Sequence, residues 1–108
     1  MTQKEPKESA RYILEEMADT RLGKDFTFIG HRVQLNAKNF VVYFIEYLNT
    51  LQNKYVILIM QQNTYTANIM EALIDWENLE PEVDDYIKRG YTLNNPDYKK
   101  YLSHDYDL

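Results

Sequence analysis

Residues 39–62 read NFVVYFIEYLNTLQNKYVILIMQQ, and this stretch decides the fold. Its first part, Asn39–Leu48, is rich in Val, Tyr, Phe and Ile, which favours a strand. A helix is the alternative, because polar residues with helical spacing are also present, at Glu46, Asn49 and Asn53. Lys54–Gln62 has a similar composition and predicts a second strand. The five residues between them suit a hairpin loop, so we expect an antiparallel pair.

Upstream of this pair, Pro6 suits the first position of a helix and Gly23 suits a helix stop. The apolar stripe of that predicted helix is Ala10, Ile13, Leu14, Met17 and Leu22. From Phe26 to Leu35 the apolar residues alternate instead, which predicts a strand. The alternation changes phase at Gly30, where we expect a bulge or tight bend. Residues 36–39 are typical of a turn.

Downstream, Thr66 is a candidate N-cap for a helix over residues 67–78. Its predicted buried side consists of Ile69, Met70, Leu73, Ile74 and Trp76. Pro81 opens a second short helix that ends at Gly90, and residues 95–102 form a last helical turn. The element order is therefore α-β-β-β-α-α. We expect an α+β fold in which a small three-stranded antiparallel sheet packs with helices. Residues 1–108 form one domain, with frayed ends at 1–5 and 103–108.

The two central strands are apolar on both sides, whereas a sheet with one wet face alternates more cleanly. If residues at even positions of both strands share one face of the sheet, that face carries Val42 and Phe44 together with Val56, Leu58 and Met60. It leaves a tyrosine-rich face, a possible dimer face, composed of Tyr43, Ile45, Tyr47, Tyr55, Ile57 and Ile59. Three covers remain open for that face: a second copy of the chain, a foreign partner, or the chain's own C-terminal segment. The residues of that segment are Tyr91, Leu93, Tyr98, Tyr101 and Leu102.

Composition excludes several kinds of chemistry. There is no cysteine, so no disulfide or thiolate site can form. No apolar run approaches the roughly 20 residues of a membrane span, and no signal peptide is expected. We therefore expect a cytoplasmic protein.

No catalytic residue is indicated. Ser9 and Ser103 lack a nucleophile-elbow pattern, and the three glycines are too far apart for a phosphate loop. His31 is interpreted as a surface strand residue. His104 and two nearby aspartates offer metal ligands, but ordering a tail would cost entropy. Carboxylate pairs are abundant, but none is singled out. The expectation is a protein that is not an enzyme and has no metal or cofactor.

Charge is distributed unevenly along the chain. The net charge is −5; residues 1–70 carry +1 and residues 71–108 carry −6. From Glu71 to Asp85 there are seven carboxylates and no lysine or arginine. An acidic surface repels phosphates and attracts basic partners, which disfavours direct nucleic-acid or membrane binding. The alternative is an acidic surface that only aids solubility.

A helix over residues 67–78 would place Glu71 and Asp75 in one outward row, about 5–6 Å apart. That spacing approaches the separation of phosphates along a nucleic-acid strand, about 3.4 Å. We therefore expect the acidic run to bind a basic protein surface, with two tyrosines at its edge. The candidate partner-binding residues are Glu71, Asp75, Glu77, Glu80, Glu82, Asp84, Asp85, Tyr86 and Tyr91.

Three segments carry a family resemblance: KDFT (Lys24–Thr27), NKYVI (Asn53–Ile57) and the acidic stretch around Trp76. With the size and element order, they resemble the small acidic type II anti-CRISPR inhibitors of phages and prophages. Some of those act as DNA mimics that occupy the motif-reading site of Cas9. This chain departs from them in its tyrosine-rich tail and more apolar hairpin. The resemblance implies an inhibitor that blocks a nucleic-acid-binding protein.

The leading hypothesis is thus a non-enzymatic acidic interaction protein that blocks a basic, nucleic-acid-binding surface of another protein. Two alternatives stay open. One is a small homodimeric structural or regulatory protein that uses its tyrosine-rich sheet face. The other is an immunity or antitoxin protein that masks a basic toxin.

Overall fold

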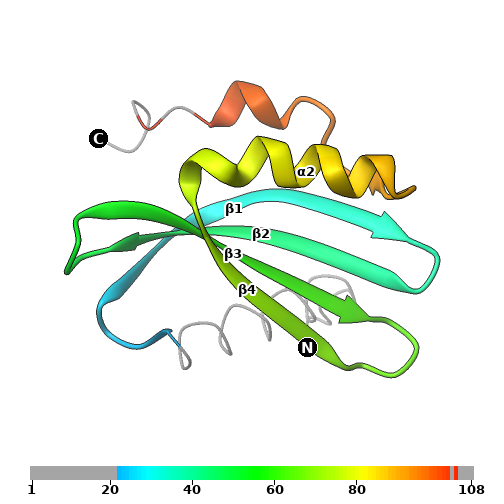
Figure 1. Cartoon of the computed structure of the whole chain (residues 1–108), viewed down its shortest axis with the longest axis horizontal. Helices are drawn as coiled ribbons and strands as arrows, with labels where there is room; N and C mark the ends of the chain where they lie inside the picture. The colour runs from blue at the N-terminus through cyan, green and yellow to red at the C-terminus, as the bar shows by residue number, and fades with distance from the viewer. Residues whose placement is uncertain (1–21, 103, 105–108) are drawn as a thin grey trace, which may run out of the picture.

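The computed structural model describes residues 22–102 and residue 104. Its main feature is a five-stranded antiparallel sheet with strand order β4-β3-β2-β1-β5 (Figure 1). The strands are β1 (Phe26–Ala37), β2 (Phe40–Asn49), β3 (Lys54–Asn63), β4 (Ile69–Asp75) and β5 (Thr92–Leu93). A 3-10 turn, η1 (Trp76–Asn78), leads into the helix α2 (Leu79–Lys88). A second 3-10 turn, η2 (Tyr98–Tyr101), follows β5.

The central hairpin is confirmed. Residues 40–49 are a strand, and Phe44 lies opposite Ile59 in the β2–β3 register. In the loop, the Asn49 side-chain oxygen accepts hydrogen bonds from the backbone N–H groups of Leu51 and Gln52. Asn53 has φ +51, in the left-handed region that Asn tolerates better than most residues. Local turn chemistry therefore closes the hairpin where the sequence predicts it.

The predicted helix over residues 67–78 is wrong, because Ile69–Asp75 is the strand β4. The reason lies in the turn before it. The side-chain oxygen of Asn63 accepts from the N–H groups of Tyr65 and Thr66, so Thr66 belongs to a tight turn and does not cap a helix. Ala67 has φ +65 within that turn. The chain is thereby reversed and placed beside β3, where its backbone groups find partners.

The predicted fold class is also wrong. The sheet has five strands in place of three, and the described part of the chain is mostly β with one helix and two 3-10 turns. The predicted short second helix exists as α2, and it ends as expected: Gly90 has φ +101 and donates its N–H to the Ile87 carbonyl. The predicted helix of residues 6–22 lies outside the described residues, except for Leu22.

Two register shifts interrupt the pairing of β1 with β2. One falls between Phe28 and Gly30, which confirms the bulge predicted at Gly30. The other falls between His31 and Val33 and makes Arg32 an extra residue. Because a bulge re-aims the side chain it carries, this second shift decides where Arg32 points.

Both faces of the central strands are buried, as their composition predicts. On the helix-covered face, α2 and η2 pack on the sheet (Figure 1). The sheet residues of its core are Val33, Leu35, Val42, Phe44, Ile57 and Ile59. The opposite face carries Val41, Tyr43, Ile45, Tyr47, Val56, Leu58 and Met60. Leu22, Phe26 and Ile69 are partly buried against it.

The parity grouping of the two faces is wrong, and the register gives the reason. Since Phe44 lies opposite Ile59, even positions of β2 share a face with odd positions of β3. The C-terminal segment does fold back onto the sheet, with Tyr98 and Leu102 in the core. It covers the face of Phe44 and Ile57, however, and not that of the β2 tyrosines.

Candidate functional site

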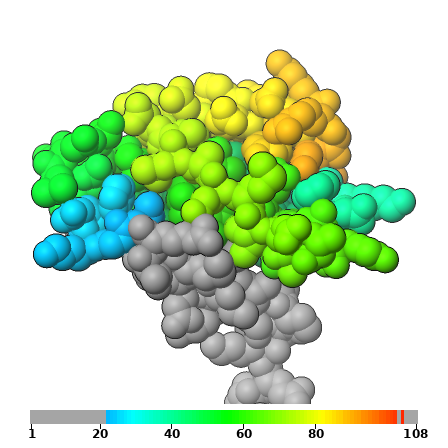
Figure 2. Space-filling model, turned by 60° about the horizontal axis from the view of Figure 1, so that its bottom comes forward, coloured from blue at the N-terminus to red at the C-terminus, as the bar shows by residue number. Residues whose placement is uncertain are grey.

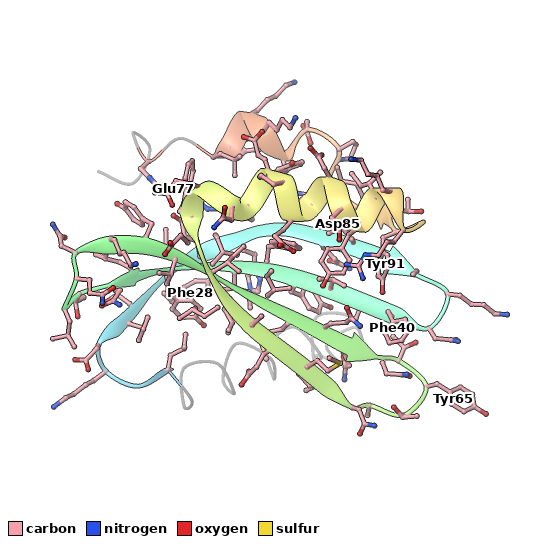
Figure 3. The ribbon with its side chains drawn as sticks, viewed as in Figure 1. Phe28, Phe40, Tyr65, Glu77, Asp85 and Tyr91 are labelled. Atoms are coloured by element: carbon pink, nitrogen blue, oxygen red, sulfur yellow. The ribbon has the colours of Figure 1, made fainter. Side chains whose placement is uncertain are left out.

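The structure divides the predicted acidic surface into separate regions. Glu71 and Asp75 lie on β4, opposite Met60 and Val56, so they point toward the opposite face. The other five carboxylates, at positions 77–85, belong to η1 and α2. Figure 3 shows Glu77 at the N-terminal end of α2, whereas Asp85 lies toward the other end. A strand alternates its side chains, so the continuous helical row that the sequence suggests does not form.

Three of the acidic residues have basic partners within the described residues. Asp75 pairs with Lys54 at 3.0 Å, and Asp85 pairs with Arg89 at 3.2 Å. Glu80 lies 3.7 Å from the Lys99 ammonium. All three pairs are solvent-exposed, and such pairs contribute about 0–1 kcal/mol and are screened by salt. They reduce the local negative charge, but a partner can displace them at little cost.

Tyr86 and Tyr91, which were predicted at the edge of the acidic surface, pack against each other and against Arg89. Arg89 lies 4.2 Å from the centre of the Tyr86 ring, and Tyr91 meets that ring edge-on. The Tyr86 hydroxyl donates to the Gln61 side-chain oxygen at 3.3 Å. Burial raises the pKa of Tyr86, against the lowering effect of Arg89. Tyr86 is buried and Tyr91 is half-buried. Figure 3 shows Tyr91 near Asp85, toward the C-terminal end of α2.

The residues predicted as a dimer face are not brought together. Tyr43, Ile45 and Tyr47 lie in the opposite-face core. Ile57 and Ile59 lie under α2, and Tyr55 shares their side of β3. All except the half-buried Tyr55 are buried.

Two hollows flank η1, and both include Trp76 and Glu77. The first has a volume of about 320 Å³ and lies beside the start of α2. It combines apolar residues with carboxylates, and its lining is Trp76, Glu77, Leu79, Glu80, Pro81, Asp84 and Leu102. The second has a volume of about 450 Å³. Its lining is Lys54, Tyr55, Asp75, Trp76, Glu77 and His104. We call the carboxylates and aromatic rings of these hollows the Trp76 surface: Tyr55, Asp75, Trp76, Glu77, Glu80, Asp84 and His104.

A buried ionic cluster, which the sequence did not reveal, adjoins the second hollow. The Glu46 side chain is 0% exposed, and its carboxylate accepts from Arg32 Nε at 2.6 Å. The other carboxylate oxygen is bonded to His104 Nε2. The imidazole of His104 stacks on Tyr55, with ring centres 3.6 Å apart, and lies 5.1 Å from the Trp76 ring. His104 is thus anchored within the predicted frayed end.

Arg32 reaches this cluster because of the second β1 bulge. Its Nη1 also donates to the Tyr101 carbonyl at 3.2 Å, so Arg32 and Glu46 together tie the C-terminal segment to the sheet. The sequence signal was Glu46 itself, a lone acid within an apolar strand. A buried carboxylate requires a paired charge, but the sequence does not name the partners.

Tyr98 makes stability sensitive to alkaline pH. Burial, helped by the carboxylates of Glu80 and Asp84, raises the pKa of Tyr98 to about 12 from the usual 10.0. Above about pH 10 the unfolded chain loses this proton first, so stability falls between about pH 10 and about pH 12. For two pKa units the loss approaches roughly 2–3 kcal/mol. Urea unfolding across this pH range measures the fall.

The matched variant is Tyr98→Phe. The Tyr98 hydroxyl is buried without a hydrogen-bond partner in the described structure, so its removal should cost less than about 1 kcal/mol at neutral pH. The alkaline fall should shrink in this variant, and the raised pKa of Tyr86 accounts for a remainder of the same sign. An unchanged fall would contradict the assignment to Tyr98.

Comparison of the chain with protein-family models, curated proteins and solved structures gave no match. Among the described residues, no helix is long and apolar enough to cross a membrane. The same residues contain no group of three His, Asp or Glu side chains that could hold a metal ion.

Proposed function

We propose that this chain is a non-enzymatic, cytoplasmic acidic interaction protein that binds a basic, nucleic-acid-binding surface of a partner protein and blocks it. Phage-type inhibitors of the DNA-mimic kind, including anti-CRISPR proteins, work in this way. An immunity or antitoxin protein that masks a basic toxin would use the same contact. The structure supports a narrower contact than the sequence suggested, centred on the Trp76 surface.

The observation that carries this proposal is the pair of hollows that meet at Trp76 and Glu77. The first offers an apolar wall of Leu79, Pro81 and Leu102. Arginine and lysine side chains consist of an aliphatic stem and a cationic head. The apolar wall suits the stem, and the surrounding carboxylates suit the head. These carboxylates are Glu77, Glu80 and Asp84.

Aromatic rings and net charge add to this contact. Trp76 is the best side chain for cation–π attraction, and Tyr and Trp are enriched among residues that dominate binding energy. The net charge of −5 steers basic partners toward the chain at low salt. Glu80 and Asp84 keep the helical i,i+4 spacing on which the comparison with nucleic acid depends.

The test uses an arginine-rich peptide as the probe, with binding measured by calorimetry and by the fluorescence of Trp76, the only tryptophan. The double variant Glu77→Lys with Asp84→Lys should weaken binding by roughly tenfold for each close charge pair lost. The matched control is Glu82→Lys with Asp85→Lys, which changes the net charge equally away from the hollows. We expect the control to retain most of the affinity.

Two further measurements test the proposed site: binding at increasing salt concentration, and binding of an acidic peptide. Binding at the Trp76 surface should weaken with increasing salt, and an acidic peptide of equal length should not bind. Equal losses in the two double variants would show that only net charge matters and would overturn the proposed site. Absence of peptide binding at low salt would overturn the proposed function.

A further inference from the structure

The outer edge of β4 meets the Trp76 surface only at Asp75, the last residue of the strand. β4 is the terminal strand of the sheet, and no strand within residues 22–102 pairs with its outer side. Natural proteins protect such edges with charged side chains, especially lysine, with proline or with bulges, and the charged residues of β4 are Glu71 and Asp75. Ile69–Asp75 contains no lysine or proline, and its pairing with β3 is regular. Met70 is 70% exposed and Leu73 is 46% exposed. Figure 2 shows the surface of this part of the chain from the side of β4.

The hydrogen-bond ladder between β3 and β4 determines which backbone N–H and C=O groups of β4 point outward. The N–H of Asn63 donates to the Asn68 carbonyl at 2.8 Å, one step before the first pair of the strand. Hydrogen-bonded and non-bonded pairs alternate along an antiparallel ladder. Even positions of β4 therefore direct their backbone groups toward β3, and odd positions direct theirs outward. The outward positions are Ile69, Glu71, Leu73 and Asp75.

We infer that β4 pairs with β4 of a second copy, antiparallel, about a twofold axis at Ala72. The two sheets would then form one continuous sheet. In this register Glu71 lies opposite Leu73 of the second copy, and Ile69 lies opposite Asp75. These pairs bring all outward N–H and C=O groups into hydrogen-bonded positions. The pair is isologous, as in most dimers.

Charge selects this register over its neighbours. Shifting the axis to Glu71 would set Glu71 against its own copy, and shifting it to Leu73 would set Glu71 against Asp75. Like charges directly opposite each other destabilise a strand pair. With the axis at Ala72, no carboxylate faces another directly, and Met70 lies opposite Ile74. This self-complementarity favours a second copy over a foreign strand.

The dimer should be weak and favoured by salt. A single strand edge belongs to the small interface class, below about 1,200 Å². Each chain carries a net charge of −5, so screening reduces repulsion between copies. Peptide binding at the Trp76 surface should respond to salt in the opposite direction, so the two proposals can fail independently.

The experiment measures the mass of the full chain by sedimentation, over concentrations up to the millimolar range. Wild type should show a reversible dimer. Leu73→Glu places a carboxylate opposite Glu71 and should weaken the dimer at least about tenfold. Leu73→Lys places an ammonium group opposite Glu71, so it should weaken the dimer less, although lysine on a sheet edge generally disfavours pairing. The matched control, Tyr65→Glu in the exposed turn before β4, should leave it unchanged. Circular dichroism verifies that each variant is folded.

Leu73→Pro provides a second route to the same test. The N–H of Leu73 points outward, so proline removes no bond to β3 but blocks the new pair. A monomer at all concentrations would overturn the inference. So would a dimer that survives both Leu73→Glu and Leu73→Pro, or equal loss in Leu73→Glu and Leu73→Lys. A monomeric chain that captures an extended foreign peptide on β4 would also overturn it.

Discussion

Replacement of Glu46 by glutamine is expected to lower the free energy of unfolding by about 3 kcal/mol. The side chain is 0% exposed, and its carboxylate contacts both Arg32 and His104. Glutamine conserves the volume but removes the charge, so the largely buried guanidinium of Arg32 loses its ion pair with Glu46. Breaking one side of a buried ion pair is costly because the remaining charge stays desolvated. Urea unfolding followed by Trp76 fluorescence measures the loss.

An exposed pair supplies the matched control for this substitution. Asp75→Asn makes the same chemical change at the Lys54 pair, where the aspartate side chain is 53% exposed. Its cost should stay below about 1 kcal/mol. Similar losses in Glu46→Gln and Asp75→Asn would contradict a special role for the buried cluster.

Replacing both Glu46 and Arg32 by apolar residues distinguishes the effect of the charges on stability from the effect of side-chain packing. Glu46→Leu alone leaves the Arg32 guanidinium without this carboxylate, so it should be strongly destabilising. Adding Arg32→Met should recover much of the loss, because well-packed apolar residues often replace a buried ion pair without net cost. The interaction between the two positions appears as a non-additive term in the double-mutant cycle.

The second large effect is expected at Ile57. Ile57→Asp removes a fully buried side chain from beneath α2, a loss of roughly 1.5–3 kcal/mol, and buries a carboxylate at several kcal/mol more. The sum approaches the 5–15 kcal/mol (about 0.05–0.15 per residue) that stabilises a typical domain. The chain should therefore be mostly unfolded at neutral pH, as circular dichroism would show.

Leu51→Asp is the matched control, because Leu51 lies in the β2–β3 loop and is 77% exposed. Its effect should stay within about 0.5 kcal/mol. Acidification that neutralises the new carboxylate should partly restore the Ile57→Asp fold. A stable Ile57→Asp chain at neutral pH would contradict the placement of this residue. Loss of a dimer in Ile57→Asp would report unfolding and would not identify an interface.

Part of the candidate site was predictable from local sequence. The acidic character of residues 77–85 is a property of composition, and the Pro81–Gly90 pattern correctly indicated a short helix. Glu71 and Asp75 have i,i+4 spacing, which fits a helix as well as a strand over so few residues. The turn anchored by Asn63 brought both residues beside β3, and it separated Glu71 from the Trp76 surface.

The Glu46 cluster was not predictable in the same way. Arg32 lies 14 residues before Glu46, and His104 lies 58 residues after it. Arg32 is re-aimed by a bulge, and His104 arrives only after α2, β5 and η2 have returned the chain to the sheet. The spacing of these residues in the sequence does not indicate that Arg32, Glu46 and His104 come into contact.

The sequence by itself determined the central hairpin, the Gly30 bulge, the end of α2 and the acidity of the C-terminal third. These features depend on neighbouring residues: β-branched and aromatic composition, turn residues and local charge. Tertiary structure alone decided the strand identity of β4, which side chains share a sheet face, and the partners of Glu46. Those outcomes depend on strand register and on contacts between distant segments, and a one-residue change of register exchanges the two faces of a strand.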